Sequence, residues 1–359
     1  MAASAAERGS KAWSDIAQKN AVAGFVDTLL RGTGQVMFQN NPLTGLLFLI
    51  GIFYNSRLLG VAALIGLVSS TATAMILRVD QPLIRAGLFG FNGILVGIGL
   101  AFFLEFAPYL IVYMVVGAAV STVVMAALAN LLGPWDMPAL TAPFVLTTWI
   151  LLFALYQLEA IRPTELIAPA IPDPAAQIQT LLRPLPGGTA GGGLSVVNLA
   201  HAFFRGIGEV MFEDNLVTGL IFLVAILINS RIAAAMAAMG SAVGAVVALL
   251  LGADGSFTYH GLYGFNPVLC AIAICGTFFV ATWKSAMYAL LAVATGTVAF
   301  ASISVLLAPI GMPALTAPFV LVTWLFLLPK AAFAVLRPVA LADVTSPEDI
   351  RKRFLGAQS

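Results

Sequence analysis

The stretch MPALTAPFVLTTW at Met137–Trp149 returns as MPALTAPFVLVTW at Met312–Trp324, and this recurrence decides the fold. The two copies differ at one position, where Thr147 corresponds to Val322. Each copy holds a threonine beside an Ala-Pro pair in a strongly apolar setting. Nearly identical stretches so far apart in one chain indicate that each belongs to a repeated structural unit.

The duplication runs through the whole of each half. RGTGQVMFQNNPLTGLLFLI, which begins at Arg31, aligns with RGIGEVMFEDNLVTGLIFLV, which begins at Arg205. GLFGFNGILVGIG, from Gly87, aligns with GLYGFNPVLCAIA, from Gly261, at the same offset of 174 positions. The opening pair is offset by 175 positions, which is one inserted residue. The chain therefore consists of two homologous halves.

Composition places the chain in a membrane. Hydrophobic residues make up 60% of the sequence, charged residues 9%, and the mean hydropathy is +1.00, whereas soluble domains carry about 25% charged residues. The net charge of +1 and the lack of a long basic block exclude nucleic acid as a partner. Cys270 and Cys275 lie in an apolar stretch and are expected to be buried thiols. Two histidines, two cysteines and few buried acids supply neither a catalytic nucleophile with its base nor a metal cluster, so no enzyme, metal site or cofactor is expected.

Apolar runs divide the first half into five candidate membrane spans, because a helix crosses a bilayer in about 20 residues. Residues 1–20 are polar, lack the regions of a signal peptide and are interpreted as an N-terminal cytosolic tail. Residues 21–158 form the first repeat half, residues 159–194 a linker rich in proline and glycine, residues 195–336 the second half, and residues 337–359 a C-terminal cytosolic tail. The expected spans are Leu43–Tyr54 with its flanks, Leu58–Leu77, Ala86–Phe106, Tyr109–Leu132 and Ala139–Leu158.

Five is an odd number, so the two halves enter the membrane from opposite sides. The predicted fold is an all-α polytopic membrane protein of two inverted repeats, related by a two-fold axis in the membrane plane. Basic residues are retained on the cytoplasmic side of membranes. Both termini are therefore expected in the cytoplasm, because basic residues flank both ends of the apolar region: Arg8, Lys11 and Lys19 before it, and Lys330, Arg337, Arg351, Lys352 and Arg353 after it.

A different element precedes the first span of each half. A polar stripe at i, i+4 and i+8 consists of Asp27, Arg31 and Gln35 in the first half and of His201, Arg205 and Glu209 in the second. One interpretation is an amphipathic helix lying on the lipid headgroups. The duplication favours two re-entrant half-helices, whose C-terminal carbonyls face the middle of the protein beside Gln35 and Glu209. Arg31 is too costly to face lipid and is expected to pair with Asp27.

From about Ala21 to Leu336 the chain resembles the urea transporters, and in particular their bacterial members, through the duplicated LTAPF, GFN and GxGxVMF motifs. The resemblance implies a homotrimer in the bacterial inner membrane, in which each protomer has its own pore built from ten spans and two half-helices. It implies passive, channel-like transport of urea or small amides, with urea and membrane lipid as partners. It maps the substrate-binding residues onto Gln35, Glu209, Phe38, Phe212, Phe91, Phe265, Leu95, Leu269, Thr141 and Thr316. Glu209 opposite Gln35 is the one asymmetry expected in this pore.

These residue types suit a flat neutral solute with four N–H donors and one carbonyl acceptor. A line of carbonyl oxygens replaces the water that urea loses, opposed phenylalanine rings form a slot that excludes hydrated ions, and Thr141 and Thr316 supply hydroxyls at the midplane, on helices interrupted by proline. Each residue has a structural alternative, since membrane phenylalanines mostly face lipid or core and membrane threonines mostly bond the i−4 carbonyl. The alternative function is a channel for another small neutral solute such as ammonia or water, although no Asn-Pro-Ala pair occurs.

Overall fold

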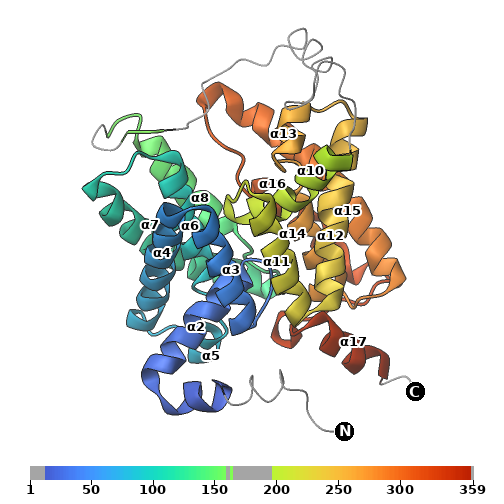
Figure 1. Ribbon diagram of the computed structural model, residues 1–359. Coiled ribbons are helices and arrows are strands. Elements are labelled where there is room, and N and C mark those ends of the chain that lie inside the picture. Colours follow the sequence, from blue (N-terminus) through green and yellow to red (C-terminus); the bar gives the residue numbers. More distant parts are fainter. Residues whose placement is uncertain (1–12, 159–161, 165–195, 357–359) are drawn as a thin grey trace.

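Helices account for nearly all the regular structure in the described part of the chain (Figure 1). The computed structural model describes residues 13–158, 162–164 and 196–356. Within these ranges there is no extended strand, and isolated bridges join Leu104 to Pro163 and Phe279 to Pro338. The predicted all-α class is therefore confirmed. Most of the predicted linker and most of the N-terminal tail lie outside the described residues.

The same order of helices occurs in both halves. Each half begins with a helix that leads into a tight turn, and its last two helices are a long one followed by a shorter one. The first half comprises α2 (Ala21–Gln35), α3 (Pro42–Asn55), α4 (Arg57–Ile76), α5 (Gln81–Arg85), α6 (Phe91–Phe103), α7 (Pro108–Leu132) and α8 (Ala142–Ala154). The second half comprises α10 (Val196–Gly208), α11 (Leu216–Asn229), α12 (Arg231–Leu250), α13 (Gly255–Tyr259), α14 (Phe265–Ile272), α15 (Trp283–Leu307) and α16 (Ala317–Leu327), and α17 (Pro347–Gly356) follows it.

Capping side chains set several helix boundaries, and they recur in both halves. The Asn41 side chain accepts hydrogen bonds from two backbone N–H groups in the first turn of α3, and Asn215 does the same for α11. Ser56 and Ser230 each accept one such bond at the start of α4 and α12. Both serines have an extended backbone, so the chain changes direction between α3 and α4 and between α11 and α12.

Within the described residues, four helices are long and apolar enough to cross a membrane by themselves: α4, α7 with its extension to Trp135, α12, and α15 with its extension to Ile310. The pair α10 and α11, bent by 73°, is a fifth if it is one broken span. The predicted spans Leu58–Leu77 and Tyr109–Leu132 nearly coincide with α4 and α7. The run Leu43–Tyr54 lies within α3, which has 14 residues and is shorter than a full span.

The predicted spans Ala86–Phe106 and Ala139–Leu158 are wrong as continuous helices. α6 and α8 each have 13 residues, fewer than the roughly 20 that a span needs. Before α6 the chain turns at Gly87, whose φ is +78°, and it packs so closely on Gly32 that a Cβ on Gly87 would overlap the Gly32 nitrogen. Before α8 the φ of Leu140 is +54°, which lies outside the helical region, so α8 cannot begin earlier.

Two hydroxyl contacts between the halves form a matched pair. The Thr44 hydroxyl on α3 donates to the Ala225 carbonyl on α11 at 2.8 Å, and the Thr218 hydroxyl on α11 donates to the Gly51 carbonyl on α3 at 3.1 Å. Thr44 is equivalent to Thr218, and Gly51 is equivalent to Ala225. The start of each helix therefore meets the later part of the other, and α3 and α11 pack antiparallel where the halves join (Figure 1).

The outer surface is as apolar as a lipid-facing surface requires. Exposed large hydrophobic side chains line α7 and α15, among them Ile111, Val112, Val115, Val116, Val123, Met287, Leu291 and Val298. Soluble monomers rarely expose apolar patches of more than a few hundred Å². The buried core runs continuously through both halves. Together with the apolar helices, this surface identifies a multi-pass membrane protein.

Candidate functional site

A tight turn follows the first helix of each half and carries a predicted pore phenylalanine. We call residues 35–38 and 209–212 the phenylalanine turns. Phe38 and Phe212 both have a left-handed backbone, with φ of +62° and +63°. For a bulky residue this conformation costs about 1–3 kcal/mol and persists only where the surrounding structure holds it.

Each turn presents its phenylalanine ring to the opposite half. The Phe38 ring packs edge to face on Phe319, and the Phe212 ring packs in the same way on Phe144, with centroids 6.1 Å apart in both pairs. Phe144 and Phe319 belong to the duplicated stretches around the central threonines. The ring contacts therefore join the turn of one half to the duplicated stretch of the other.

The two central threonines meet between the halves. Thr141 Oγ1 and Thr316 Oγ1 are 2.7 Å apart, and the two residues expose only 2% and 3% of their surface. They occupy the N-cap positions of α8 and α16, and their hydroxyls bond each other rather than a carbonyl four residues earlier. The predicted interruption of these helices by proline is wrong, because Pro143 and Pro318 lie in the first turns, where proline is tolerated.

An asparagine side chain makes hydrogen bonds to the backbone on both sides of each threonine. Asn92 Oδ1 on α6 accepts from the Phe144 backbone N–H at 3.0 Å, and its Nδ2 donates to the Leu140 carbonyl at 3.3 Å. Asn266 on α14 makes the same two bonds in the second half, at 3.0 and 3.2 Å. No role is predicted for these asparagines from the sequence, although each is a repeated polar residue in an apolar stretch. They hold the left-handed residue before each threonine in place.

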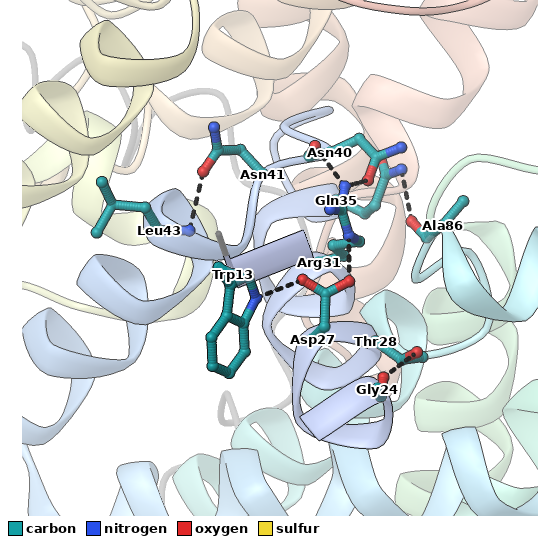
Figure 2. A network of polar contacts seen from close by, with 10 residues as sticks. All are labelled: Trp13, Gly24, Asp27, Thr28, Arg31, Gln35, Asn40, Asn41, Leu43 and Ala86. Atoms are coloured by element: carbon teal, nitrogen blue, oxygen red, sulfur yellow. Dashed lines mark hydrogen bonds and ion pairs between the residues drawn. The ribbon is translucent and has the colours of Figure 1, made fainter. Parts of the chain in front are cut away.

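The polar stripe of α2 forms a local network (Figure 2). Arg31 Nε lies 2.6 Å from Asp27 Oδ2, which confirms the predicted ion pair. Arg31 also donates to Asn40 Oδ1 at 2.9 Å, and Trp13 Nε1 donates to Asp27 Oδ1 at 2.7 Å. A cavity of about 690 Å³ lies beside this network, lined by α2, by the residues between 14 and 20 and by the end of α5. The network therefore connects Trp13, which precedes α2, to the residues of α2 that line this cavity.

Gln35 and Glu209 are equivalent in sequence but differ in bonding. Gln35 Nε2 donates to the Ala86 carbonyl at 2.9 Å, which fixes the amide to the turn before α6 (Figure 2). The Glu209 carboxylate makes no hydrogen bond to any residue in the described part of the chain. Its charged neighbours are Arg205 and the two acidic residues that follow Phe212.

The second half replaces three amides with acids. Gln35, Gln39 and Asn40 correspond to Glu209, Glu213 and Asp214. Asp214 lies 3.1 Å from Arg205 Nε and 2.6 Å from His260 Nδ1, so Arg205 pairs with a residue beyond the turn and not on its own helix. The segments around the phenylalanine turns therefore differ at two positions besides the predicted asymmetry at Glu209. The aligned motifs QVMFQNN and EVMFEDN already contain the other two differences.

The remaining predicted pore residues lie on α6 and α14. Phe91 and Phe265 begin these helices and are buried, as are Leu95 and Leu269 one turn later. The Phe265 ring packs on Phe300, with centroids 5.5 Å apart. Among the described residues no ring contact joins Phe91 or Phe265 to a phenylalanine turn. The slot of four rings therefore stays a prediction.

The chemistry that this region offers is hydrogen bonding and aromatic confinement. Cys270 and Cys275 are free thiols, and both are buried. Across residues 13–158, 162–164 and 196–356, no group of three or more histidine, cysteine, aspartate or glutamate residues could hold a metal ion. Beside the central threonines and the phenylalanine turns, the side chains that bond between the halves are hydroxyls and amides, together with the carboxyl group of Glu213. The halves are also joined by an ion pair of Lys330 with Asp136, at 2.8 Å.

Comparison with known proteins identifies one family. The urea transporter family model matches residues 26–331. The chain is 34% identical over 334 residues to urea transporter 1 of Ovis aries. The aligned residues cover 92% of this chain and 84% of that relative. It is also 34% identical over 341 residues to urea transporter 1 of Rattus norvegicus, which covers 94% of this chain and 85% of that relative.

Proposed function

This chain belongs to the urea transporter family, and we propose that it conducts urea passively along a path between its two halves. Family membership makes the protein a membrane transporter and not an enzyme. The observation that best supports this path is the 2.7 Å contact of Thr141 with Thr316, because it joins equivalent residues of the two repeats where the halves meet.

The proposed path requires the two halves to be inverted repeats. A two-fold axis in the membrane plane relates equivalent helices in opposite directions, and the antiparallel packing of α3 and α11 supports this relation. In this arrangement α2 and α10 are re-entrant half-helices, and both termini lie in the cytoplasm. The resemblance to bacterial members extends the proposal to a homotrimer in the inner membrane, with one pore in each protomer.

Urea has to replace its lost water with hydrogen bonds inside the protein. α2 ends at Gln35 and α10 at Gly208, and the last carbonyls of each helix carry the negative end of its dipole. N–H groups of the turns donate to the Gly34 and Gly208 carbonyls, and each carbonyl oxygen has a second lone pair that can accept from a solute. These oxygens suit the N–H groups of urea, and Gln35 and Glu209 add acceptors beside them. Weak sites in a row allow urea to pass from one to the next without a deep energy minimum.

Aromatic rings select the shape of the solute. Phe38 and Phe212 confine the path near each end, and in this proposal Phe91 and Phe265 form the opposite walls of the slot. Leu95 and Leu269 add apolar lining nearby. A hydrated ion receives no replacement for its water between phenylalanine rings, so the slot favours a flat neutral molecule.

The threonine pair is the proposed midpoint. In the absence of solute the two hydroxyls satisfy each other, which avoids the cost of a buried unpaired hydroxyl. When urea lies between them, each hydroxyl exchanges that bond for a bond to urea, which has both donors and an acceptor. Because bonds are exchanged and not lost, the crossing of the midpoint needs no charge and no ion coupling.

Osmotic flux in proteoliposomes tests this function. Stopped-flow light scattering is recorded after mixing with urea, glycerol or an ammonium salt, and protein-free liposomes serve as the control. We expect urea to enter the proteoliposomes much faster than it enters the control, with glycerol unaffected. Accelerated ammonium-driven swelling or water flux without accelerated urea entry would favour the ammonia or water channel and reject the proposal.

A further inference from the structure

Two asparagine side chains cross from one half to the other next to the phenylalanine turns. Asn55 ends α3, and its Nδ2 donates to Glu213 Oε2 at 2.6 Å. Asn229 ends α11, and its Nδ2 donates to Gln39 Oε1 at 2.8 Å. Glu213 and Gln39 are the residues that immediately follow the two turn phenylalanines. We call these two contacts the asparagine clamps.

We propose that Asn55 and Asn229 are positioning residues that set the selectivity of the path for its solute. Each clamp fixes the residue after a turn phenylalanine to a helix end of the opposite half. Consecutive residues share a planar peptide group, so a displaced clamped residue moves the phenylalanine before it. This inference rests on the proposed function, because selectivity has meaning only for the solute that the path conducts.

The side chains of the two clamped residues, Gln39 and Glu213, are buried. Their backbone N–H groups make the hydrogen bonds that close the two turns. Gln39 exposes 1% of its surface and Glu213 exposes 0%. The Gln39 N–H donates to the Gly34 carbonyl at 3.0 Å, and the Glu213 N–H donates to the Gly208 carbonyl at 3.2 Å. The left-handed phenylalanine before each of them needs such external support. Loss of a clamp therefore allows the turn to relax and its ring to shift.

The two clamps are unequally supported. Gln39 Nε2 also donates to the Met37 carbonyl at 2.6 Å, so the first turn keeps a side-chain bond of its own. Glu213 has no amide nitrogen, and its Oε1 is buried without a hydrogen-bond partner in the described part of the chain. Asn229 Oδ1 also accepts from Asn41 Nδ2 at 3.2 Å. The bond of Gln39 to Met37 nevertheless remains when Asn229 is replaced, so the side chain after the second turn phenylalanine depends more on its clamp than the one after the first.

Substitution of the asparagines tests the positioning role. Asn55→Leu removes the hydrogen-bond donor and keeps a side chain of similar volume. The readout is the ratio of N-methylurea flux to urea flux in proteoliposomes. This ratio does not depend on the amount of reconstituted protein. We expect this ratio to rise about fivefold, the factor that corresponds to one hydrogen bond. Asn229→Leu is expected to change the ratio less. Asn130→Leu, at an exposed position of α7, is the matched control and is expected to keep the parental ratio.

A donor–acceptor exchange separates positioning from a general loss of stability. Asn55→Asp opposes two carboxyl groups at the clamp and is expected to raise the flux ratio. Adding Glu213→Gln to Asn55→Asp restores one donor and one acceptor with their direction reversed, and is expected to return the ratio to its parental value. Glu213→Gln alone copies the amide of the first half and is expected to keep the parental ratio.

A parental flux ratio in Asn55→Leu would overturn the positioning role, as would failure of the double variant to restore the ratio. If Asn55→Leu does not fold, the comparison of Asn55→Asp with the double variant decides the question. Absence of urea flux in the unmodified protein is a separate result. It would overturn the proposed function and this inference with it.

Discussion

Replacing both Thr141 and Thr316 with valine removes the two central hydroxyls and keeps the side-chain volume. Each hydroxyl contributes about 0.5–1.5 kcal/mol of net hydrogen bonding to a solute between them. Loss of both raises the barrier by about 1–3 kcal/mol, which slows urea flux by about 5-fold to 150-fold. Stability should change little, because both partners of the 2.7 Å pair become apolar. A single valine leaves one buried hydroxyl unpaired and should lower the free energy of unfolding by about 1–3 kcal/mol.

Initial rates of urea-driven volume change in proteoliposomes, divided by the amount of reconstituted protein, measure this effect. Thr297→Val on α15 is the matched control. Thr297 is equally buried, at 2% exposed, but its hydroxyl bonds the Val293 carbonyl of its own helix at 3.1 Å. We expect the control to conduct urea at the parental rate. A folded double valine variant that also conducts at the parental rate would refute the assignment of the midpoint to the threonine pair.

Alanine at both Phe91 and Phe265 should widen the slot and raise thiourea flux relative to urea flux, and an unchanged selectivity series in stopped-flow assays would count against the slot. Glu209→Gln should keep substantial urea flux with an altered apparent affinity, because the first half carries an amide at the equivalent position; loss of all flux in a folded protein would indicate a charge-dependent mechanism. Asn92→Leu should lower the free energy of unfolding by about 1–3 kcal/mol, since a buried N–H and a buried carbonyl lose their partner. Thermal unfolding in detergent measures this loss. An unfolding temperature equal to that of Asn130→Leu would contradict the stabilising role of the Asn92 hydrogen bonds.

The duplication explains why the arrangement of helices was largely predictable. Apolar runs located α4 and α7 closely, because long lipid-facing helices need continuous hydrophobicity. The pair of Asp27 and Arg31 followed from i, i+4 spacing on one helix. The starts of α6 and α8 were not predictable in this way. Leu140 has a left-handed backbone without being glycine, so composition leaves no signal there.

The contact at the centre of the candidate site was predictable where a residue repeats and has obvious chemistry. Thr141 and Thr316 were found because the duplicated stretches place them at equivalent positions, and the structure brings them together. Asn55 and Asn92 were missed, because their partners lie 158 and 52 residues away along the chain and become visible only after folding. The acid at Glu213 was visible in the aligned repeats, but its burial is a property of the packing between the halves.

The position of a bound solute decides whether the path runs between the two halves. Crystals of the protein soaked in selenourea, a planar urea analogue, reveal each bound molecule through the anomalous scattering of selenium. We predict a peak between the two phenylalanine turns, beside Thr141 and Thr316, that disappears in the presence of excess urea. Peaks confined to the outer surface or to the cavity beside Arg31, with none between the halves, would contradict the proposed path.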